Sequence, residues 1–547
     1  MPAFVVVTGG VVSSIGKGST TASLAALMQA RGFRTSVVKI DPYLNVDAGL
    51  MSPIEHGEVY VTYDGVETDL DIGNYERFLG VKISGNNNLT TGKVYSQVLA
   101  LERNGHYLGK TVQILPHLTN FIKDTIIGIA KEIDILLIEV GGVVGDIESQ
   151  PFIETLRQLH LDRNNRCVYV HLGLIPFLES VNENKTKPMQ HSVKMLLSMG
   201  IQPDFLVCRS QRPLRPSELE KIAMFCNVDS GRVIASPDIL SKYQLPAKLS
   251  EAKLDQLILD HLGMAAPGGE GKIALWSQLS EQIANAKTLP TIQLGFVRKY
   301  LSNVDNYVSL IDSLILTGYR NNVAVKINFL DMNSTDLKAE VLAQDAIVVA
   351  GGFGETSIET KIEAITAARE NNLPFLGICL GFQLACVEFA RSILKLKASN
   401  TEEVDPNVEH PIIMELGKLF AIEEGENGKT FRQIKRIGSR TIDIQPNSLF
   451  HTVYNSDTCE ERYRHRFTLN SKYRAQFEAA GLKFSMTNTE GEHQTVEGFE
   501  LPSADFFVGV QFHPEYLSTV FNPHPIFDHL VKKGIKRAEA RHEPPKA

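Results

Sequence analysis

The stretch Val5-Val-Val-Thr-Gly-Gly-Val-Val-Ser-Ser-Ile-Gly-Lys-Gly-Ser19 decides how the first half of the chain folds. Its apolar residues run into glycines, a lysine follows at position 17, and a segment with helical spacing begins after it. This order predicts a strand, a glycine-rich loop and a helix whose first backbone amides point at one spot. Such a spot suits a phosphate, because a helix N-terminus carries unpaired N–H groups and a partial positive charge. A plain glycine-rich turn is the alternative interpretation.

The loop departs from the Walker A motif in two places. Five residues separate Gly10 from Gly16, and Gly18 stands where a Ser or Thr usually binds the metal ion. A magnesium ion near this loop therefore needs carboxylates from elsewhere in the chain. The candidates are Asp71 and Glu139. Glu139 ends an apolar run, at the strand edge where open α/β sheets bind ligands. For Asp71 a solvated surface acid is the alternative.

Size and composition indicate a protein of more than one domain. The 547 residues are too many for one hydrophobic core. The net charge is −8, so we expect no nucleic acid and no membrane surface among its partners. Six cysteines occur without a CxxC pair, which argues against zinc and disulfide frameworks and favours a reducing cytosol. No stretch is long and apolar enough to span a bilayer, so we expect a cytoplasmic protein.

Short β-branched runs alternate with helical patterns in both halves. This alternation predicts an α/β protein of two doubly wound domains, the first built on a parallel sheet. The expected strands are residues 4–8, 35–40, 133–140, 167–174, 204–208, 232–235, 291–297, 323–330, 346–350, 374–378 and 506–512. The expected helices include residues 20–30, 190–199, 305–317, 359–371 and 382–394. Chain breakers at 263–271 place a linker at 266–290 between domains at 1–265 and 291–547, and residues 399–438 are expected to form a long loop or small hairpin.

The second half carries a nucleophile-elbow pattern with Cys in place of Ser, Gly377-Ile-Cys-Leu-Gly381. Small flanking residues leave room for the strained turn, and the helix that follows favours a thiolate at its N-terminus. Downstream, His513 and Glu515 share one face if the backbone stays extended, so that Glu515 orients His513 and His513 deprotonates Cys379. Backbone amides of residues 350–352 are candidates for an oxyanion hole. The pattern predicts acyl transfer through a thioester; a buried core cysteine is the alternative.

Three more features of the first half suggest nucleotide contacts. Lys39 ends the second expected strand, where it can pair phosphates beside Lys17. The run Asp146-Ile147-Glu148 offers acceptors to a ribose or base. The run Lys185-Thr-Lys-Pro-Met-Gln190 offers cations and amides to an anion. An ordinary charged surface is the alternative for either run alone.

At these residues the chain resembles the CTP synthase family along nearly its whole length. The runs that carry the resemblance are Gly9-Gly-Val-Val-Ser-Ser-Ile-Gly-Lys-Gly18, Lys39-Ile-Asp-Pro-Tyr43, Ser52-Pro-Ile-Glu-His-Gly57, Glu67-Thr-Asp-Leu-Asp71, Gly145-Asp-Ile-Glu-Ser149 and residues 185–190. The second half resembles a class I glutamine amidotransferase domain, which is flavodoxin-like. The resemblance therefore implies a synthetase (amidoligase) domain at 1–265 and a glutaminase domain at 291–547.

The resemblance implies a ligase of pyrimidine biosynthesis with two sites. ATP phosphorylates O4 of UTP, and ammonia from glutamine hydrolysis displaces the phosphate to give CTP. The residues implied for ATP are Ser14, Ile15, Gly16, Lys17, Gly18, Ser19 and Asp71, with Lys17 and Lys39 offsetting transition-state charge and Asp71 and Glu139 binding Mg²⁺. The residues implied for UTP or CTP are Ser13, Asp146, Ile147, Glu148, Lys185, Thr186, Lys187, Pro188, Met189, Gln190 and Lys221. The residues implied for glutamine are Gly352, Leu380, Gly381, Phe382, Gln383, Glu402 and Arg466, around the catalytic Cys379, His513 and Glu515.

The departures from the family pattern all lie in the second half. After Gly351-Gly-Phe-Gly354 the family continues with Arg-Gly and a further Gly, where this chain has Thr356, Ser357 and Thr360. Arg298 replaces a usual Gly, Lys435-Arg436-Ile-Gly438 replaces a Met-Arg-Leu-Gly run, and Glu403 replaces a Phe. In the family these positions belong to loops and a lid linked to GTP activation and glutamine access. GTP activation therefore stays open.

Two other functions stay open as well. One is another ATP-dependent glutamine amidotransferase-synthetase with a different acceptor, against which the runs at 146–148 and 185–190 argue. The other is a catalytically impaired, nucleotide-sensing filament subunit. The resemblance also implies CTP as feedback inhibitor, GTP as allosteric activator, a homotetramer and filament assembly.

Overall fold

The computed structural model describes residues 2–162, 165–268, 270–298, 304–352, 357–419, 435–490 and 493–542. The chain forms two compact units. The first comprises Met1–Met51 and Glu67–Asn285, and the second comprises Ser52–Val66 and Ala286–Ala547. In the parts of the chain described, no helix has the length and apolar character needed to cross a membrane.

The first unit is built on a seven-stranded sheet with the order β11-β10-β7-β1-β6-β2-β5. All neighbouring strands whose register is known run parallel. The strands are β1 (Ala3–Gly9), β2 (Thr35–Asp41), β5 (Asn88–Thr90), β6 (Ile135–Val140), β7 (Arg166–Ile175), β10 (Phe205–Ser210) and β11 (Val233–Pro237). They are buried on both faces because their sequences are nearly continuous apolar runs, as a parallel sheet covered by helices requires. The parallel sheet predicted for the first half is confirmed.

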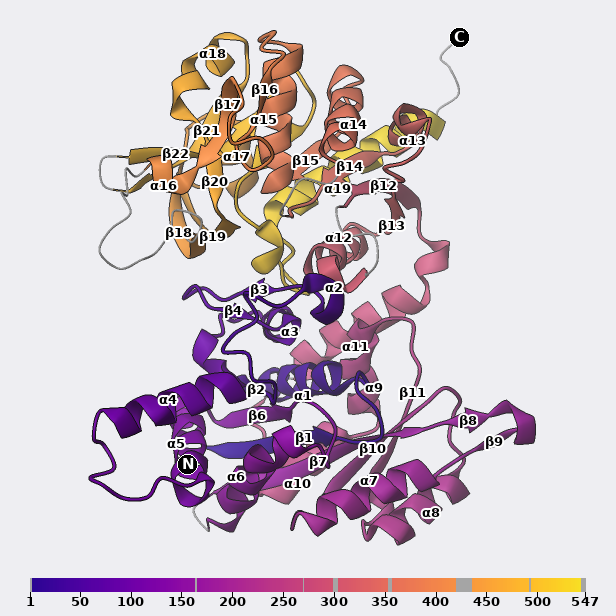
Figure 1. Ribbon diagram of the computed structural model, residues 1–547. Helices are drawn as coiled ribbons and strands as arrows, with labels where there is room; N and C mark the ends of the chain where they lie inside the picture. Colours follow the sequence, from indigo (N-terminus) through magenta and orange to yellow (C-terminus); the bar gives the residue numbers. More distant parts are fainter. Residues whose placement is uncertain are drawn as a thin grey trace. The chain divides into compact units, whose positions relative to one another are not determined.

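Helices cover both faces of this sheet (Figure 1). They are α1 (Lys17–Ala30), α3 (Leu70–Leu79), α4 (Thr91–Arg103), α5 (Thr119–Ile129), α6 (Gln150–Leu161), α7 (Lys187–Ser198), α8 (Pro216–Cys226), α9 (Leu245–Glu251), α10 (Leu254–Leu262) and α11 (Glu270–Ala284). Phe4 and Val6 of β1 pack against Ile122 and Phe152 in the core cluster on the α5–α6 side. Short strands β4 (Glu67–Thr68), β8 (Phe177–Leu178) and β9 (Glu183–Asn184) complete the unit.

Much of the predicted linker is a helix of the first unit. Residues Glu270–Ala284 form α11, which packs against α1 and α9. Trp276 is 3% exposed, and its ring stacks on Phe78 with centroids 5.4 Å apart. The breaker-rich residues end α10, where Gly263 adopts a φ of 62°, but α11 follows them almost at once. The buried residues of α11 recur at helical spacing, which explains why it docks.

The second unit is built on a nine-stranded mixed sheet with the order β13-β12-β14-β15-β23-β22-β21-β18-β19. Its first five strands run parallel, in the second-first-third-fourth-fifth order of flavodoxin-like folds. These strands are β12 (Thr291–Val297), β13 (Ala324–Phe329), β14 (Ala346–Val349), β15 (Phe375–Ile378) and β23 (Phe507–Val510). An antiparallel extension follows, with β18 (Arg436–Ile444), β19 (Thr458–His465), β21 (Lys483–Glu490) and β22 (His493–Glu500). The predicted α/β class with two doubly wound domains is confirmed, and the extension adds to it.

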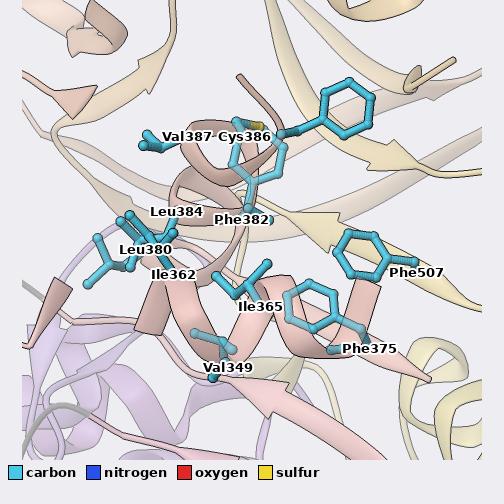
Figure 2. Packing of buried hydrophobic residues seen from close by; sticks show 14 of the residues in the cluster. Val349, Ile362, Ile365, Phe375, Leu380, Phe382, Leu384, Cys386, Val387 and Phe507 are labelled. Carbon is cyan, nitrogen blue, oxygen red and sulfur yellow. The ribbon is translucent and has the colours of Figure 1, made fainter. Parts of the chain in front are cut away.

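Side chains of β15 and its neighbours divide between two cores. On one face, Phe375 and Val349 pack with α14 and α15, and Figure 2 shows this cluster around Phe382. On the other face, Leu376 and Ile378 pack with α12, α17 and α19. The helices of the unit are α2 (Pro53–His56), α12 (Val308–Arg320), α13 (Leu337–Leu342), α14 (Ile358–Glu370), α15 (Leu380–Ser392), α16 (Leu416–Leu419), α17 (Leu449–Tyr454), α18 (Arg474–Ala479) and α19 (Pro525–His542).

Residues 399–438 contain more regular structure than the predicted loop. Strands β16 (Ser399–Thr401) and β17 (His410–Glu415) form a small sheet with β20 (Phe467–Leu469), and β18 begins at Arg436. Residues 420–434 lie outside the described part of the chain. The prediction of a long loop is therefore wrong for both ends of this range, and β16 and β17 pair in parallel, so they do not form the small hairpin either.

The segment Ser52–Val66 joins the second unit although it lies within the first half of the sequence. It carries α2 and the short strand β3 (Tyr60–Val61). The Tyr60 hydroxyl donates to the Tyr516 carbonyl oxygen (3.0 Å), and the buried Arg462 donates to the Tyr60 hydroxyl (2.9 Å). The Glu58 carboxylate accepts from the backbone N–H of Ser309 (2.9 Å). These buried polar contacts fix the segment on the glutaminase-like unit.

Candidate active sites

The glycine-rich loop of the first unit joins the end of β1 to the start of α1. Val11, Ser14 and Gly16 have φ values of 78°, 56° and 94°, so the backbone turns sharply in the left-handed region. Ser13 and Ser14 are exposed, whereas Ile15 is only 6% exposed. Ile15 therefore has only backbone to offer a ligand. The loop presents the free N–H groups of the first turn of α1, as the sequence predicted.

Lys17 folds back over this loop. Its Nζ donates to the Gly142 carbonyl oxygen (2.6 Å), which follows β6. A Cβ at Gly9 would lie 2.8 Å from the Lys17 side chain, so glycine makes room for the lysine. Burial, together with the charge of Lys39, lowers the pKa of Lys17 although Glu139 attracts its proton. Among the described residues no carboxylate forms a salt bridge with this ammonium, which is held at the loop by the Gly142 carbonyl.

Gly18 is required by the position of Asp71. A Cβ at residue 18 would overlap the Asp71 carboxylate, which reaches this point from the first turn of α3. The carboxylate therefore fills the space where the Walker A hydroxyl would stand. A Ser or Thr at position 18 would leave no room for Asp71, so the absence of the hydroxyl and the position of the candidate metal ligand are linked. The sequence indicated only that a carboxylate from elsewhere was needed.

The Lys39 ammonium lies among carboxylates at the carboxyl edge of the sheet. It bonds Glu139 Oε1 (3.0 Å) and Asp71 Oδ2, and the Tyr75 hydroxyl donates to Glu139. Burial alone would lower the pKa of Lys39, but the charges of Asp71 and Glu139 raise it well above its usual value. Burial raises the pKa of Asp71, but the charge and hydrogen bond of Lys39, together with the charges of Lys242 and Lys17, outweigh burial and lower the pKa overall. The two candidate metal ligands are thus within reach of one cation.

The oxygen ligands of Asp71 and Glu139 suit a magnesium ion that is bound together with substrate phosphates. Within the described ranges there is no group of three or more His, Cys, Asp or Glu side chains able to hold a metal by themselves. Mg²⁺ is commonly bound through one or two carboxylates together with substrate phosphates and water. Asp71 and Glu139, which converge on Lys39 beside the glycine-rich loop, match that pattern.

The residues predicted for the pyrimidine nucleotide differ in accessibility. Lys187 and Lys221 are exposed, and the Lys185 ammonium pairs with Glu183 (2.7 Å). Met189 is fully buried, and its sulfur fills the space over Gly173 of β7. The side chain of Met189 belongs to the core, so only its backbone remains for a ligand. The other predicted contacts are exposed at Asp146, Ile147 and Glu148, half-buried at Pro188 and buried at Thr186 and Gln190.

A buried histidine connects the end of β1, just before the glycine-rich loop, to α7. His171 lies on β7, with Nδ1 2.8 Å from Thr8 Oγ1 and Nε2 2.7 Å from Ser192 Oγ. A Cβ at Gly10 would overlap Ser192, so the loop packs directly on α7. Burial lowers the pKa of His171 to about 3, which keeps the ring neutral. The sequence reasoning missed this residue; the signal was a single polar residue inside an apolar strand.

The second unit contains the predicted nucleophile elbow. Cys379 directly joins β15 to α15 and has φ 51° and ψ −101°, a strained conformation for a residue with a side chain. A Cβ at Gly377 would lie 2.7 Å from Gly381, and a Cβ at Gly381 would overlap the Val349 carbonyl. The glycines on both sides are thus needed for the turn, and the elbow prediction is confirmed.

His513 and Glu515 meet as predicted, but not on an extended chain. Residues Pro514–Tyr516 form a 3₁₀ turn, and His513 Nδ1 still lies 2.7 Å from Glu515 Oε1. Burial lowers the pKa of His513, but attraction to Glu515 and hydrogen bonding with Cys379 outweigh it and raise the pKa to about 10. The other ring nitrogen, Nε2, is buried and forms no hydrogen bond that meets the usual distance and angle limits within the described residues. It is therefore available to the Cys379 thiol, whose interaction with His513 contributes to the raised pKa. The thiol can therefore give its proton to this ring.

A cavity of about 60 Å³ lies over the thiol; we call it the Cys379 cavity. It is lined by Cys379, His513, Glu515, Gly351, Gly352, Arg464, Tyr307, Asn306, Leu310, Tyr516, Pro53, Glu58 and Val59. A Cβ at Gly351 would lie 3.1 Å from the His513 ring and 3.4 Å from Cys379 Cβ, so glycine keeps this space open. The lining residues from the segment Ser52–Val66 were not predicted for this site.

The other residues predicted for glutamine lie either in the hydrophobic core or in a second cavity, separate from the Cys379 cavity. Leu380 and Phe382 point into the hydrophobic core, as Figure 2 shows, and only their backbone amides remain for a ligand. A second cavity of about 350 Å³, which we call the Glu402 cavity, brings Glu402 and Arg466 together with Lys418 and Glu415. Glu402 accepts from Lys418 (2.9 Å), so its charge is already partly neutralised.

The departures near the predicted lid have different surroundings. The Arg298 guanidinium stacks over Phe329 at 4.1 Å. Arg436 is buried, bonds Glu497 (2.6 Å) and lies over the Tyr463 ring. Thr356 lies outside the described residues. Arg436 is thus engaged inside its own unit.

Comparisons with known proteins agree for both halves of the chain. The family model for the CTP synthase N-terminus matches residues 3–264, and the model for class-I glutamine amidotransferase matches residues 303–533. A CTP synthase from Pelotomaculum thermopropionicum is 45% identical over 99% of this chain and 100% of its own length.

Among solved structures, the glutaminase domain of Trypanosoma brucei CTPS with bound acivicin matches at 28% identity. The match covers 45% of this chain and 94% of that one, with a TM-score of 0.41. A glutamine amidotransferase from Thermotoga maritima matches at 15% identity over 45% of this chain and 97% of that one, with a TM-score of 0.28. The full-length identity to a curated relative establishes that this chain belongs to the CTP synthase family.

Proposed function

We propose that the protein makes CTP from UTP, ATP and glutamine. ATP would phosphorylate O4 of UTP in the first unit, and ammonia from glutamine would displace the phosphate. The observation that supports this most is that one chain of this family holds both a phosphate loop with convergent carboxylates and a Cys-His-Glu array. The first set would activate the C4–O4 bond of UTP, and the second would release from glutamine the ammonia that forms the C4–N bond as phosphate leaves.

In the first unit the loop and its cations would bind the triphosphate of ATP. Residues Ser14–Ser19 offer N–H groups, and Lys17 and Lys39 carry positive charge toward the transferring phosphoryl group. Mg²⁺ bound by Asp71 and Glu139 would neutralise phosphate charge. Lys39 would then be released from the carboxylates toward the phosphates.

The pyrimidine nucleotide would lie toward α7 and the turn after β6. Ser13 and the cations Lys185, Lys187 and Lys221 suit a UTP triphosphate, and Gln190 and Thr186 add polar groups. Asp146 to Glu148 would accept hydrogen bonds from CTP acting as feedback inhibitor. The His171 bridge holds the loop and α7 in register for these two nucleotides.

In the second unit Cys379 would attack the glutamine amide carbon. His513 takes the thiol proton and returns it to the departing ammonia, while Glu515 holds the imidazolium. Water then cleaves the thioester to give glutamate. Gly352 lines the Cys379 cavity, and the backbone groups of Leu380 and Gly381 follow the thiol in the chain. Glu402 and Arg466 would hold the amino acid part of glutamine, and the buried Gln383 would act from behind the thiol.

Several properties are carried over as part of this proposal. They are a cytoplasmic location, a homotetramer, filament assembly and an activating effect of GTP. Arg298, which replaces a usual Gly and stacks on Phe329, points to a weak GTP response.

The test is incubation of the purified protein with Mg²⁺, ATP, glutamine and UTP. We expect CTP, ADP, phosphate and glutamate. Amidation of a different acceptor with no CTP would identify another ATP-dependent synthetase. Nucleotide binding and assembly, followed by light scattering, without turnover would identify a nucleotide-sensing subunit. Either result would overturn the proposal.

A further inference from the structure

Two buried glutamines lie behind the Cys379 thiol. Gln511 follows β23 and is fully buried, and Gln383 lies on α15 and is 3% exposed. The Gln511 backbone N–H donates to the Glu497 carbonyl oxygen (2.9 Å), which fixes the main chain at this point. Gln511 is not one of the residues to which the proposed reaction gives a role.

The orientation of both amides follows from one carbonyl group. Gln383 Nε2 donates to the Phe467 backbone oxygen (3.0 Å), which can only accept. The same nitrogen lies 3.1 Å from Gln511, so the atom of Gln511 facing it must be the amide oxygen. The nitrogen of Gln511 must then face the other way, toward the sulfur of Cys379.

The Gln511 amide reaches the reacting atom of the elbow. Its Nε2 donates to Cys379 Sγ at 3.6 Å, a normal length for a hydrogen bond to sulfur. The Sγ–H of the thiol can donate to His513, and it also makes a long contact with the Arg464 carbonyl (3.9 Å). A donor aimed at the sulfur favours the thiolate over the thiol, because a hydrogen bond strengthens when its acceptor becomes charged.

We propose that Gln511 is a further catalytic residue of the glutaminase site, whose amide N–H stabilises the Cys379 thiolate while Gln383 fixes its orientation. The proton leaves Sγ for Nε2 of His513, and the negative charge that stays on sulfur is shared with the Gln511 N–H and the N-terminus of α15. This inference rests on the proposed function only in taking Cys379 as the nucleophile.

Other charged and titratable groups also face the thiol. They are His513 with Glu515, the Arg464 and Glu58 side chains that line the Cys379 cavity, and the hydroxyls of Tyr307 and Tyr516. All of them remain in a Gln511 variant, so a changed pH profile reports the amide itself.

The experiment measures alkylation of Cys379 by iodoacetamide from pH 5 to 10 in the full-length protein, with the site identified by peptide mass. Gln511→Met keeps the side-chain length and removes the donor. We expect the rate at pH 7 to fall about tenfold and the pH profile to move up by about one unit, the loss of one hydrogen bond to a charged group. For glutamine hydrolysis by Gln511→Met, the fold decrease in kcat should be larger than the fold increase in KM.

Two further variants separate this effect from a packing defect. Gln511→Glu has the same shape and can still accept from Gln383, but it turns an oxygen toward the sulfur; its profile should move up at least as far as that of Gln511→Met. Gln344→Met removes another buried amide of the same unit, which bonds Glu340 and Asn328 far from the thiol, and should leave the profile unchanged. Thermal unfolding checks that each variant is folded.

Wild-type alkylation profiles in both folded Gln511 variants would overturn the inference. If Gln511→Met does not fold, the Gln511→Glu profile decides alone. Alkylation needs neither UTP nor ATP, so the result is independent of which acceptor receives the ammonia. Absence of CTP formation would refute the proposed function and leave this measurement valid.

Discussion

The two units use the same junction, a parallel strand that turns into a helix, for opposite purposes. Between β1 and α1, residues 10–16 form a loop with several positive φ angles, and the helix N-terminus is left open for an anion from outside. Between β15 and α15 there is no loop: Cys379 alone makes the turn, and the anion is its own side chain. A long glycine-rich turn thus recruits a charged ligand, whereas a one-residue strained turn holds a nucleophile.

The surroundings of the two junctions follow from this difference. The loop is surrounded by full charges, with Lys17, Lys39, Asp71 and Glu139 close together, which is what the proposed binding of phosphates and a metal ion requires. The elbow has the His513–Glu515 pair and the neutral Gln511 amide beside the thiol, and Arg464 and Glu58 also line its small cavity, which suits one thiolate. The predictions below test whether the junctions are as independent as this chemistry implies.

The largest effect should come from Cys379→Ala. Glutamine-dependent CTP synthesis should fall by at least about 10⁴-fold, as when other enzymes lose their nucleophile. Synthesis with ammonium should stay near the wild-type rate, because the loop and its cations are unchanged. Loss of the ammonium-dependent rate in a folded variant would refute the independence of the two sites.

Lys17→Ala should reduce both activities by roughly 10²–10³-fold, since a charge aimed at the transferring phosphoryl group is lost. Synthesis rates with glutamine and with ammonium would be measured side by side. The alkylation rate of Cys379 should not change, which provides the matched control in the other unit. A loss confined to the glutamine-dependent rate would contradict the assignment.

Gly18→Ser would restore the Walker A hydroxyl and test why it is absent. The new Cβ overlaps the Asp71 carboxylate, so Asp71 or α1 has to move. We expect ammonium-dependent synthesis to fall about tenfold or more, with a raised Mg²⁺ requirement, because misplaced positioning groups cost that much. Gly271→Ser, where a Cβ meets nothing within 4 Å, is the control. An active Gly18→Ser protein would show that the carboxylate does not replace the hydroxyl.

A pH effect on stability should be found in the second unit. The pKa of His513 is raised to about 10, above the ordinary value near 6.5, so its bound proton stabilises the fold below pH 6.5 and this stability is lost as pH rises through 10. The contribution is on the order of a few kcal/mol. Glu515→Gln removes the attraction, so its melting temperature should be lower at pH 7 and should change less between pH 7 and 10. Parallel melting curves for the two proteins would contradict this.

The smallest effect concerns GTP. Arg298→Gly combined with Thr356→Arg restores the family pattern at two departures. We expect a modest gain, about twofold to fivefold, in GTP stimulation of the glutamine-dependent rate, with no change in the ammonium-dependent rate; gains of this size match ordinary coupling energies. An unchanged GTP response would remove these positions from the explanation.

Features that depend on local sequence were predictable. Continuous apolar runs predicted the parallel strands. The glycines beside Lys17 and Cys379 predicted the two strand–helix junctions, because each junction requires a particular backbone conformation. The contact between His513 and Glu515 was also predicted from their spacing, although through a different backbone shape. The family motifs predicted nucleotide-binding residues only as whole runs of sequence. They did not distinguish Lys187, whose side chain is exposed, from Met189, whose side chain packs in the core.

Features that depend on distant contacts were not predictable. The segment Ser52–Val66 joins the second unit through Tyr60, whose partners Tyr516 and Arg462 lie far along the chain. Trp276 was read as part of a linker because its partner Phe78 is equally remote. His171 and Gln511 gained their roles only when Thr8, Ser192, Cys379 and Gln383 were brought beside them. Whether a polar residue is buried depends on tertiary contacts, which cannot be read from a single sequence.

The central claim is that the two junctions work in series, one activating UTP and the other supplying nitrogen. The most direct measurement is mass analysis of CTP made with amide-¹⁵N glutamine in the presence of unlabelled ammonium. The wild-type protein should give CTP carrying the label, and Cys379→Ala should give only unlabelled CTP at a comparable ammonium-dependent rate. A complete absence of label in CTP from the wild-type protein, or labelled CTP from Cys379→Ala, would contradict the account.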